Sequence, residues 1–514
     1  MALPTTTRTS GKSGIWNCLL VGVLVSALSA SAVWWVWAKV SILFYGDAEA
    51  HLNTARRIWD STTPGLDQLG TPWLPLPHLI MLPLVRIDPL WRSGLAGAIP
   101  SAACFVIACL FLFAAVRRFF ASPLPAFAAV ALFALNPNVL YLQSVPMNEP
   151  VFWAALLGLL YFTVRFSLTR HLAWAFAAGL AACAASLTRY EGWFLIPFVA
   201  AYFVFRRRIA GAVAFSVVAA AGPLLWLGYN WWLTGDALYF YRGLGSAMAI
   251  QANQPYPGKN DWWTALHYYR TAAGLAAGPG LSLASLAGLI AVVCKRSVWP
   301  LVLLLLPGAF YVWSMHSAAS PIFVPVLWPG SYYNTRYGTA VLPFAAVAAS
   351  AVVAVTPARA RAWVACLLPL ACALAWVIPP NPHRFVVWEE SRANSVARRD
   401  WTQQAAEFLG PRYIPGTGIL TTFGDVTGIF REAGIPLRET FTECNGLPWL
   451  AAVRRPELFL QREWAVVRGG DEAQSAITRA ALRGIAYKLE KTIIVKGAPV
   501  VEIYRRTGGF HGPS

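Results

Sequence analysis

The first motif whose residue types could carry chemistry is GDAEAH at residues 46–51, which directly follows an aromatic-rich apolar segment. Asp47, Glu49 and His51 supply two carboxylates and an imidazole within one short stretch, a set that suits proton abstraction or metal binding. At the end of a membrane helix these groups are expected to be partly desolvated, and desolvation makes a carboxylate a stronger base. The alternative is a solvated helix start in which Asp47 is the N-cap.

Two further motifs place charges in short turns between apolar segments. One is PMNEP at 146–150, which contains Glu149, and the other is TRYEG at 188–192, which contains Arg189, Tyr190 and Glu191. Such short turns are expected to keep these charges close to the membrane or inside it, where ions are costly and mark functional sites. The alternatives are ordinary first-turn helix chemistry for Glu149 and an Arg189–Glu191 pair that neutralises itself, although Arg189 would keep spare donors.

A fourth motif, YYNTRYG at 332–338, surrounds Arg336 with Tyr333, Asn334 and Tyr337. A guanidinium offers bidentate donors and phenols add hydroxyl groups, so the motif suits a phosphate clamp. The same residues would also fit an interfacial aromatic belt with a snorkelling arginine. Composition alone leaves both interpretations open.

The composition of the chain shows where these motifs must lie. Of 514 residues, 57% are hydrophobic and only 12% are charged, whereas soluble proteins carry roughly 25% charged residues. The net charge of +18 comes with basic clusters in short loops between apolar segments, so we expect a membrane protein with no nucleic-acid partner. A P-loop, a Rossmann fingerprint, a zinc-protease motif and a GxSxG motif are all missing from the sequence.

Eleven apolar runs predict an α-helical polytopic membrane protein with about eleven transmembrane helices, although several runs are shorter than a straight span needs. The runs are Ile15–Leu43, Gly94–Val116, Pro125–Leu142, Val151–Phe166, Leu172–Leu187, Gly192–Phe205, Ile209–Leu233, Pro279–Cys294, Val298–Met315, Thr339–Val355 and Ala362–Ile378. Residues 1–14 form the expected cytoplasmic N-terminus and residues 15–380 the membrane domain, with long outer loops at 45–92 and 234–278.

The charges segregate to the two sides of this topology. With a cytoplasmic N-terminus, basic clusters such as Arg206–Arg208 fall on the inner side, which the positive-inside rule requires. The acids before residue 380 all fall on the outer side: Asp47, Glu49, Asp60, Asp67, Asp88, Glu149, Glu191, Asp236 and Asp261. This sidedness suggests chemistry at the outer face.

The composition changes after residue 380, where charges of both signs become mixed along the chain. Runs at Gly418–Phe423, Trp464–Arg468, Thr492–Val495 and Val500–Tyr504 predict strands, and the segments near Trp401–Leu409 and Asp471–Arg483 predict helices. Residues 381–514 are therefore expected to form a small α/β domain, and an odd number of spans places it outside the cytoplasm.

The order and sidedness of the four motifs resemble those of the GT-C glycosyltransferases. Among these, the chain looks most like the bacterial relatives of protein O-mannosyltransferase and of the lipid A aminoarabinose transferase. The resemblance covers roughly residues 15–380. It implies transfer of a sugar from a polyprenyl-phosphate donor to an acceptor hydroxyl on a lipid, glycan or protein, at the outer face of the bacterial inner membrane.

The resemblance also implies roles for individual residues. It makes Asp47 the general base and Glu49 its acidic partner, although Ala48 separates two acids that mannosyltransferases carry side by side. Arg189 and Arg336 become candidates for binding the donor phosphate. The supporting residues are His51, Glu149, Tyr190, Glu191, Tyr333, Asn334 and Tyr337.

Several alternatives stay open at this point. A divalent cation, Mg²⁺ or Mn²⁺, bridging Asp47, Glu49 and Glu149 is one of them. A phosphate leaving group departs as a stable anion, so one carboxylate with cations would suffice for an inverting transfer, whereas a glycosidase needs two carboxylates. A transporter or flippase of lipid-linked glycans is the competing function, and a structural subunit is a third.

Overall fold

The computed structural model describes residues 11–251, 253–294, 299–378 and 383–507, so most of the predicted cytoplasmic segment and the start of the predicted C-terminal domain lie outside the described residues. The chain divides into two compact units. The first contains Met1–Val40, Thr71–Pro77 and Ala98–Glu390, and the second contains Ser41–Gly70, His78–Gly97 and Ser391–Ser514. The second unit is therefore assembled from segments that are far apart in the sequence.

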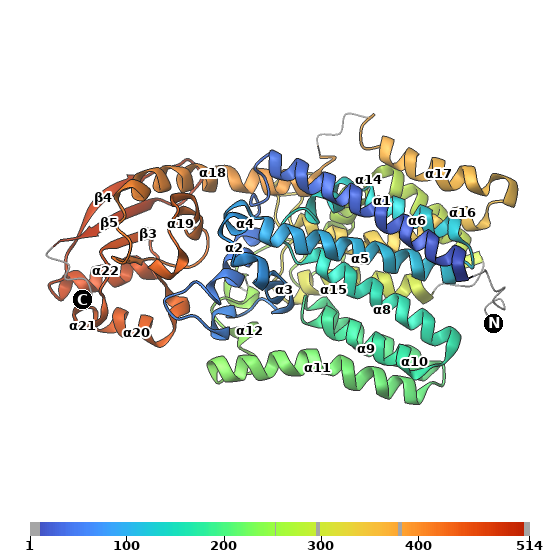
Figure 1. The fold of residues 1–514 in the computed structure, drawn as a ribbon, viewed down its shortest axis with the longest axis horizontal. Coiled ribbons are helices and arrows are strands. Elements are labelled where there is room, and N and C mark those ends of the chain that lie inside the picture. The colour runs from blue at the N-terminus through green and yellow to red at the C-terminus, as the bar shows by residue number, and fades with distance from the viewer. Residues whose placement is uncertain (1–10, 252, 295–298, 379–382, 508–514) are drawn as a thin grey trace. The chain divides into compact units, whose positions relative to one another are not determined.

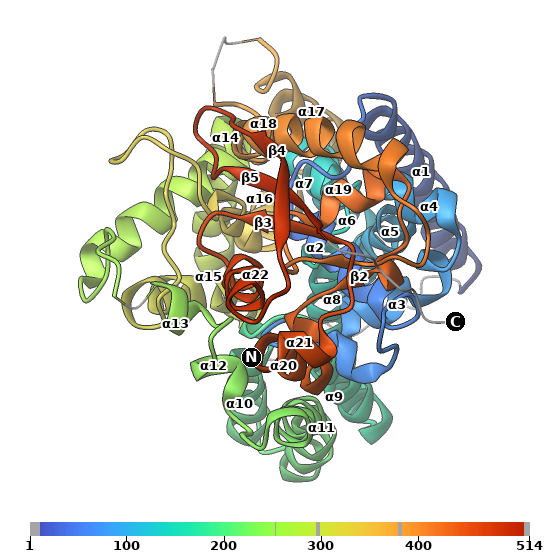
Figure 2. The same ribbon diagram turned by 90° about the vertical axis from the view of Figure 1, so that its left-hand side faces the viewer.

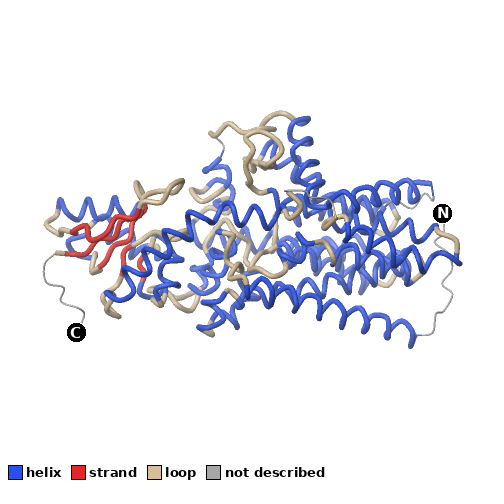
Figure 3. The backbone as a smooth tube through the Cα atoms, turned by 90° about the horizontal axis from the view of Figure 1, so that it is seen from above, coloured by secondary structure: helices blue, strands red, loops and turns tan. Residues whose placement is uncertain are grey.

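The first unit consists of helices, the longest of which run alongside one another (Figures 1 and 3). They are α1 (Gly11–Ala38), α5 (Leu95–Phe119), α6 (Pro123–Ala134), α7 (Pro137–Leu142), α8 (Glu149–Thr169), α9 (Leu172–Ser186), α10 (Glu191–Phe205), α11 (Ile209–Thr234), α12 (Tyr239–Arg242), α13 (Ala247–Gln251), α14 (Trp262–Cys294), α15 (Trp299–Ser317), the 3₁₀ helix η2 (Thr335–Val341), α16 (Leu342–Val355) and α17 (Ala358–Leu374). Helix α9 packs against both α8 and α11, and α14 packs against α16.

Every predicted apolar run is helical over most of its length, and the α-helical membrane fold is confirmed. Among the described residues, seven helical segments are long and apolar enough to cross a membrane, so the predicted count of eleven spans is not established. These segments lie in α1, α5, α8, α11, α14 and α15 and in η2 together with α16.

The prediction of one continuous helix at Pro125–Leu142 is wrong. The chain leaves the helix between α6 and α7, where the Asn136 side chain accepts hydrogen bonds from the backbone N–H groups of Asn138 and Val139. Pro137 occupies the first turn of α7, and an Asn N-cap followed by proline is strong helix-start chemistry. This local signal therefore prevails over continuous hydropathy.

The second unit contains a five-stranded sheet in the order β2-β1-β3-β5-β4 (Figure 2). Its strands are β1 (Ile419–Leu420), β2 (Thr440–Phe441), β3 (Trp464–Arg468), β4 (Tyr487–Ile493) and β5 (Val501–Arg506). Strand β1 runs parallel to β2 and β3, and β5 runs antiparallel to β3 and β4. The predicted strand Thr492–Val495 is misplaced, because β4 begins at Tyr487 and ends at Ile493.

Helices cover both faces of this sheet, as the alternation of side chains in β3 requires. Trp464 and Val466 point into a core shared with α18 (Val386–Leu409) and α19 (Thr427–Ala433), and Ala465 and Val467 point into a second core with α20 (Leu447–Arg454) and α22 (Glu472–Leu482). The short helix α21 (Pro456–Phe459) follows α20. The predicted small C-terminal α/β domain is therefore confirmed as a fold.

The second unit also contains α2 (Gly46–Arg57), most of α3 (Leu76–Val85) and α4 (Asp88–Ser93). Hydrogen bonds tie these segments to the sheet domain. Asp60 accepts from the backbone N–H groups of Leu437 at 3.2 Å and Arg438 at 3.3 Å, and Arg92 donates to the Arg431 carbonyl at 2.9 Å. The region around the first motif and the C-terminal segment therefore form one folded body.

Candidate active site

A cluster of buried charges in the first unit brings together residues from three of the four motifs. Glu149 is the first residue of α8, Arg189 and Glu191 lie at the α9–α10 turn, and Arg336 lies in η2. All four side chains are at most 9% exposed. All four charges lie at or next to the start of a helix. The interiors of these helices therefore remain apolar.

The Arg189 guanidinium is the centre of this cluster. Its Nε donates to Glu191 at 2.6 Å, its Nη1 donates to Glu149 at 3.0 Å and to Asn148, and its Nη2 donates to Tyr311. The donors that Arg189 keeps beyond its pair with Glu191 are therefore mostly used on Glu149, Asn148 and Tyr311. The Arg189–Glu191 pair is real, but it belongs to a larger network and is not isolated.

Arg336 joins the same network from the other side of Glu149. Its Nε lies 3.3 Å from Oε1 of Glu149, and its backbone N–H donates to Glu390 at 3.0 Å. Oε1 of Glu149 therefore faces two arginines. The other carboxylate oxygen, Oε2, is buried and has no hydrogen-bond partner among the described residues. An orphaned acceptor of this kind favours a donor group from a ligand, because leaving it unpaired costs about 1–3 kcal/mol.

Aromatic rings line the two arginines. The rings of Tyr311 and Tyr337 stack with centroids 4.5 Å apart, and the Arg189 and Arg336 guanidinium carbons lie 5.1 Å and 5.2 Å from the Tyr337 ring centre. Tyr269 stacks on Tyr311 at 5.9 Å. Each guanidinium group therefore has an aromatic ring against its planar face, while its N–H groups point outward along its edge. This arrangement suits the binding of an anion in a site from which water is excluded.

The glycines that end two of the motifs allow the close approaches that build the cluster. A Cβ atom on Gly192 would lie 2.5 Å from the Ala185 carbonyl oxygen, and one on Gly338 would lie 2.4 Å from the Ala272 carbonyl oxygen. Any side chain at either position would push the neighbouring helix away. In the TRYEG and RYG motifs, the glycine after the charged residue therefore lets the neighbouring helix pack closely against the turn.

The remaining predicted supporting residues of the first unit have structural contacts. The Tyr190 hydroxyl donates to the Pro72 carbonyl at 2.6 Å and accepts from the Trp226 indole at 3.2 Å. Tyr333 pairs with Phe323 through backbone hydrogen bonds, and Asn334 donates to the Pro321 carbonyl at 3.0 Å. These contacts hold the turns on which Arg189 and Arg336 lie.

Three cluster members were not predicted from the sequence. Asn148 contacts Arg189, Tyr311 bridges Arg189 and Glu191, and Glu390 contacts Arg336. Asn148 was visible beside Glu149 in the PMNEP motif. Tyr311 carried a weaker signal as a phenol in the middle of an apolar run, whereas Glu390 gave none, because its distance in sequence from Arg336 hides the pairing.

Asp47 lies in the second unit, at the second residue of α2. The N-cap of that helix is Tyr45, so the alternative in which Asp47 caps the helix is wrong. A carboxylate in the first turn is stabilised by the positive end of the helix dipole. The side chain is half-buried, which leaves it accessible to a reacting group.

Glu49, on the same helix, is bound on both sides. One oxygen accepts from Nη1 of Arg398, and the other accepts from Nε of Arg431 at 3.1 Å. All three side chains are at most 11% exposed. Burial would lower the pKa of Arg431, but the Glu49 and Glu432 carboxylates raise it above its usual range. This geometry fits an ion-pair partner better than a base with free lone pairs.

His51 forms a buried pair with His78, in which Nδ1 of His51 lies 2.9 Å from Nε2 of His78. The contact requires one proton between the two rings, so at least one imidazole carries a defined tautomer. Nowhere in the described parts of the chain do three or more His, Cys, Asp or Glu side chains gather as a metal site would require. Both Glu49 oxygens contact arginines, so a cation at Glu49 would have to displace one of them; the divalent cation considered from the sequence stays a prediction.

The comparisons with known proteins agree with this architecture. Residues 91–232 match the model of the dolichyl-phosphate-mannose-protein mannosyltransferase family, and no curated protein matches the chain in sequence. Among solved structures, ArnT from Cupriavidus metallidurans bound to undecaprenyl phosphate has a TM-score of 0.55 at 14% identity, covering 96% of this chain and 99% of that one. The apo state of the same protein has a TM-score of 0.52 at 15% identity, covering 98% and 100%.

The matched segment includes Glu149, Arg189 and Glu191, and the structural likeness extends well beyond it. The predicted resemblance to the GT-C membrane glycosyltransferases is therefore confirmed, in sequence over residues 91–232 and in fold over nearly the whole chain.

Proposed function

We propose that this protein transfers a sugar from a polyprenyl-phosphate donor to an acceptor hydroxyl outside the cytoplasm. The observation that carries the proposal is the buried cluster of Arg189, Arg336, Glu149 and Glu191, most of which lies in the segment that matches the mannosyltransferase family. Ions buried at the ends of apolar helices are costly to desolvate, and residues of this kind in a membrane protein usually mark a functional site. The phosphate of a membrane lipid is negatively charged, as a ligand of two arginines should be, and it would lie near the ends of the membrane helices, where these arginines are.

The two arginines are assigned to the donor phosphate. Guanidinium groups bind phosphate through paired charge-assisted hydrogen bonds, and the aromatic faces beside them exclude water. Binding would draw Arg189 and Arg336 partly away from Glu149, which they share at 3.0 Å and 3.3 Å. ArnT, whose fold the chain shares, was solved with undecaprenyl phosphate, and this supports a lipid phosphate as the donor's leaving group.

Asp47 is assigned as the general base. It takes the proton from the acceptor hydroxyl as that oxygen forms a bond to the anomeric carbon, and the bond from this carbon to the phosphate oxygen breaks. The electron pair of that bond leaves with polyprenyl phosphate, whose negative charge the arginines stabilise. A single displacement of this kind inverts the anomeric centre.

Glu149 is assigned to the sugar. Its oxygen Oε2 is buried without a partner among the described residues, and a sugar hydroxyl is a donor that would satisfy it. The side chain is fixed by two arginines through its other oxygen, so its position is defined before the donor binds.

A direct test uses the purified full-length protein with a panel of polyprenyl-phosphate sugars. We expect release of polyprenyl phosphate with at least one donor, measured by mass spectrometry. A flippase or transporter would move the lipid-linked sugar across a vesicle membrane without cleaving it. Translocation of intact donor with no cleavage in any panel member would therefore contradict the proposed transfer.

The proposed orientation places the C-terminal unit outside the cytoplasm, because the basic clusters of the short loops fall on the opposite side. An alkaline phosphatase fused after Ser514 is expected to be active in cells, since it folds only in an oxidising compartment. The matched fusion, a fluorescent protein active only in the cytoplasm, should stay dark. The reverse pattern would show that the topology is inverted.

A further inference from the structure

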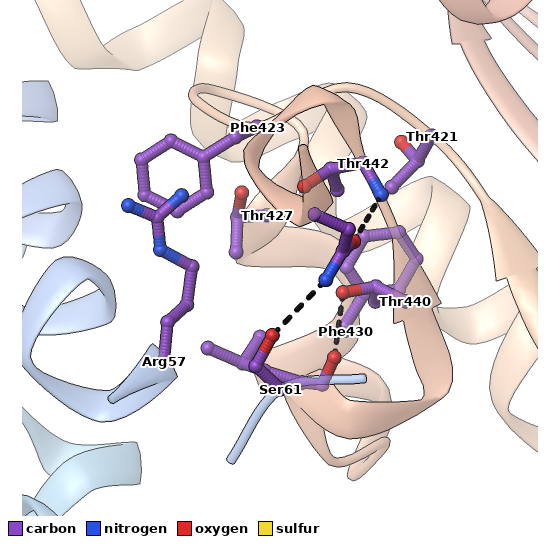
Figure 4. Close-up of a pocket in the computed structure, with 10 residues that line it drawn as sticks. Arg57, Ser61, Thr421, Phe423, Thr427, Phe430, Thr440 and Thr442 are labelled. Carbon is purple, nitrogen blue, oxygen red and sulfur yellow. Dashed lines mark hydrogen bonds between the residues drawn. The ribbon is translucent and has the colours of Figure 1, made fainter. Parts of the chain in front are cut away.

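The second unit contains a small pocket between the C-terminal end of α2 and the sheet domain, and this pocket is partly open to solvent. Figure 4 shows that Arg57 and Ser61 line one side of it and that Thr421, Phe423, Thr427 and Thr442 line the other. The pocket is formed entirely by residues of the second unit. It contains no member of the charge cluster described above.

Arg57 supplies the charge of the pocket and is only 7% exposed. Its Nη2 donates to the Gln68 carbonyl at 2.8 Å, and its guanidinium carbon lies 3.7 Å from the centre of the Phe423 ring. Nε and Nη1 are buried and have no hydrogen-bond partner among the described residues. A buried guanidinium with unused donors is costly, whereas most buried arginines are paired with a carboxylate.

The neighbouring groups do not supply that partner. The Glu443 carboxylate attracts Arg57 electrostatically, but its hydrogen bonds are accepted from the Phe423 backbone N–H at 3.1 Å and not from the guanidinium. The Cys444 thiol interacts with Arg57, but burial raises the pKa of this thiol. A neutral thiol is a weak acceptor.

Hydroxyl groups make up much of the remaining lining. The Thr421 hydroxyl is buried and has no partner among the described residues. The Thr427 hydroxyl accepts from the Gly424 N–H at 3.2 Å and the Thr442 hydroxyl accepts from the Cys444 N–H at 3.3 Å, so the protons of both remain available for donation. Among the described residues that line the pocket, none is Asp or Glu. Ser61, Thr440 and Asn445 already donate to neighbouring groups, so Arg57, Thr421, Thr427 and Thr442 are the donors that a ligand would meet.

We infer that this pocket binds an oxyanion, a phosphate or carboxylate group, through Arg57 and the threonine hydroxyls. A negative ligand would satisfy the two unused guanidinium nitrogens and the Thr421 hydroxyl at once, which a neutral hydroxyl group, itself both donor and acceptor, would do less well. The pocket is small and partly open, so the oxyanion group would enter it and the rest of the molecule that carries it would stay outside. The site is separate from the donor phosphate site proposed for Arg189 and Arg336.

The inference is tested by titrating the full-length protein in detergent with inorganic phosphate, acetate or glycerol while amide hydrogen exchange is followed by mass spectrometry. Phosphate or acetate should slow exchange in peptides covering residues 421–427 and 440–445, and the more effective of the two identifies the anion class. This readout distinguishes the pocket from the arginine cluster, which contains neither peptide. Glycerol should leave exchange unchanged.

Three variants complete the test. Arg57→Gln should weaken the anion-dependent protection roughly 10- to 100-fold, as expected for loss of charged hydrogen bonds. Thr421→Val, which keeps the shape and removes one hydroxyl, should weaken it less and remains informative if Arg57→Gln fails to fold. The matched control is Arg412→Gln, because Arg412 also lies over a phenylalanine ring and donates to a carbonyl but is exposed.

The outcomes are separable from those of the proposed transfer reaction. Protection by an anion that is lost in Arg57→Gln or Thr421→Val and kept in Arg412→Gln would support the site, whether or not any donor is cleaved. Absence of protection by both anions, equal protection by glycerol, or protection unaffected by Arg57→Gln and Thr421→Val would overturn it.

Discussion

Replacing Asp47 with asparagine is expected to reduce sugar transfer by about 10² to 10⁴, because the amide keeps the shape of the side chain and cannot accept a proton. Asp47 lies half-buried in the first turn of α2, and asparagine has nearly the same size and shape. The melting temperature should therefore stay close to that of the unaltered protein. Turnover is measured as polyprenyl phosphate released per enzyme at saturating donor and acceptor.

Two variants of the same unit make this prediction specific. Asp67→Asn is the matched control, since Asp67 also lies in the second unit and its carboxylate contacts Gln68. Its turnover should be unchanged. Glu49→Gln should instead act through stability, because it leaves the buried Arg398 and Arg431 without their shared charge, a loss of about 3–5 kcal/mol. Near-normal turnover in Asp47→Asn together with a folded but inactive Glu49→Gln would move the base to Glu49.

Substituting Arg189 with lysine is expected to weaken donor binding by roughly 10- to 100-fold, although the charge is kept. The guanidinium contacts Glu191, Glu149, Asn148 and Tyr311 from three nitrogens, and a single ammonium cannot reach all of these acceptors and a phosphate as well. Arg336→Lys should act in the same direction. Donor affinity is measured with a fluorescent polyprenyl-phosphate sugar.

Lysine is preferable to alanine for this test, because alanine would leave Glu149 and Glu191 buried without a cation and could unfold the turn. Arg242→Lys provides the control. Arg242 pairs with Asp236 at 2.6 Å in the same unit, but its side chain is 64% exposed, so its pair is screened by water. Donor affinity equal to that of the unaltered protein in both Arg189→Lys and Arg336→Lys would leave the cluster with a structural role.

The fold was predictable where one physical signal dominated. Long apolar runs specify helices whatever their neighbours, and strand β3 matches its predicted bounds because Trp464–Arg468 is buried on both faces. Strand β4 was misplaced because most of its side chains are exposed, and Lys488 and Lys491 make it look like a loop. Charged residues on an edge strand prevent unwanted pairing and at the same time obscure the hydrophobic pattern.

The candidate site was predictable as a set of residue types but not as a set of contacts. The motifs around Glu149, Arg189 and Arg336 were visible because charges stand out in apolar sequence. The partners of Glu49 were not visible, since Arg398 and Arg431 lie more than three hundred residues away in an ordinary solvated composition. The unpaired carboxylate oxygen of Glu149 could not be predicted from the sequence, because it depends on the absence of a nearby hydrogen-bond donor among the described residues of the folded structure.

The buried contact of Glu49 with Arg398 and Arg431 has a consequence for how such a protein can be recombined. A chimera that exchanges residues 391–514 with a homologue would bring in foreign arginines, or none, against this carboxylate. A glutamate that is buried without its arginine partners destabilises the fold, whether it comes from this protein or from the homologue. The segments 41–70 and 78–97 and the C-terminal segment therefore have to be exchanged together in any such chimera.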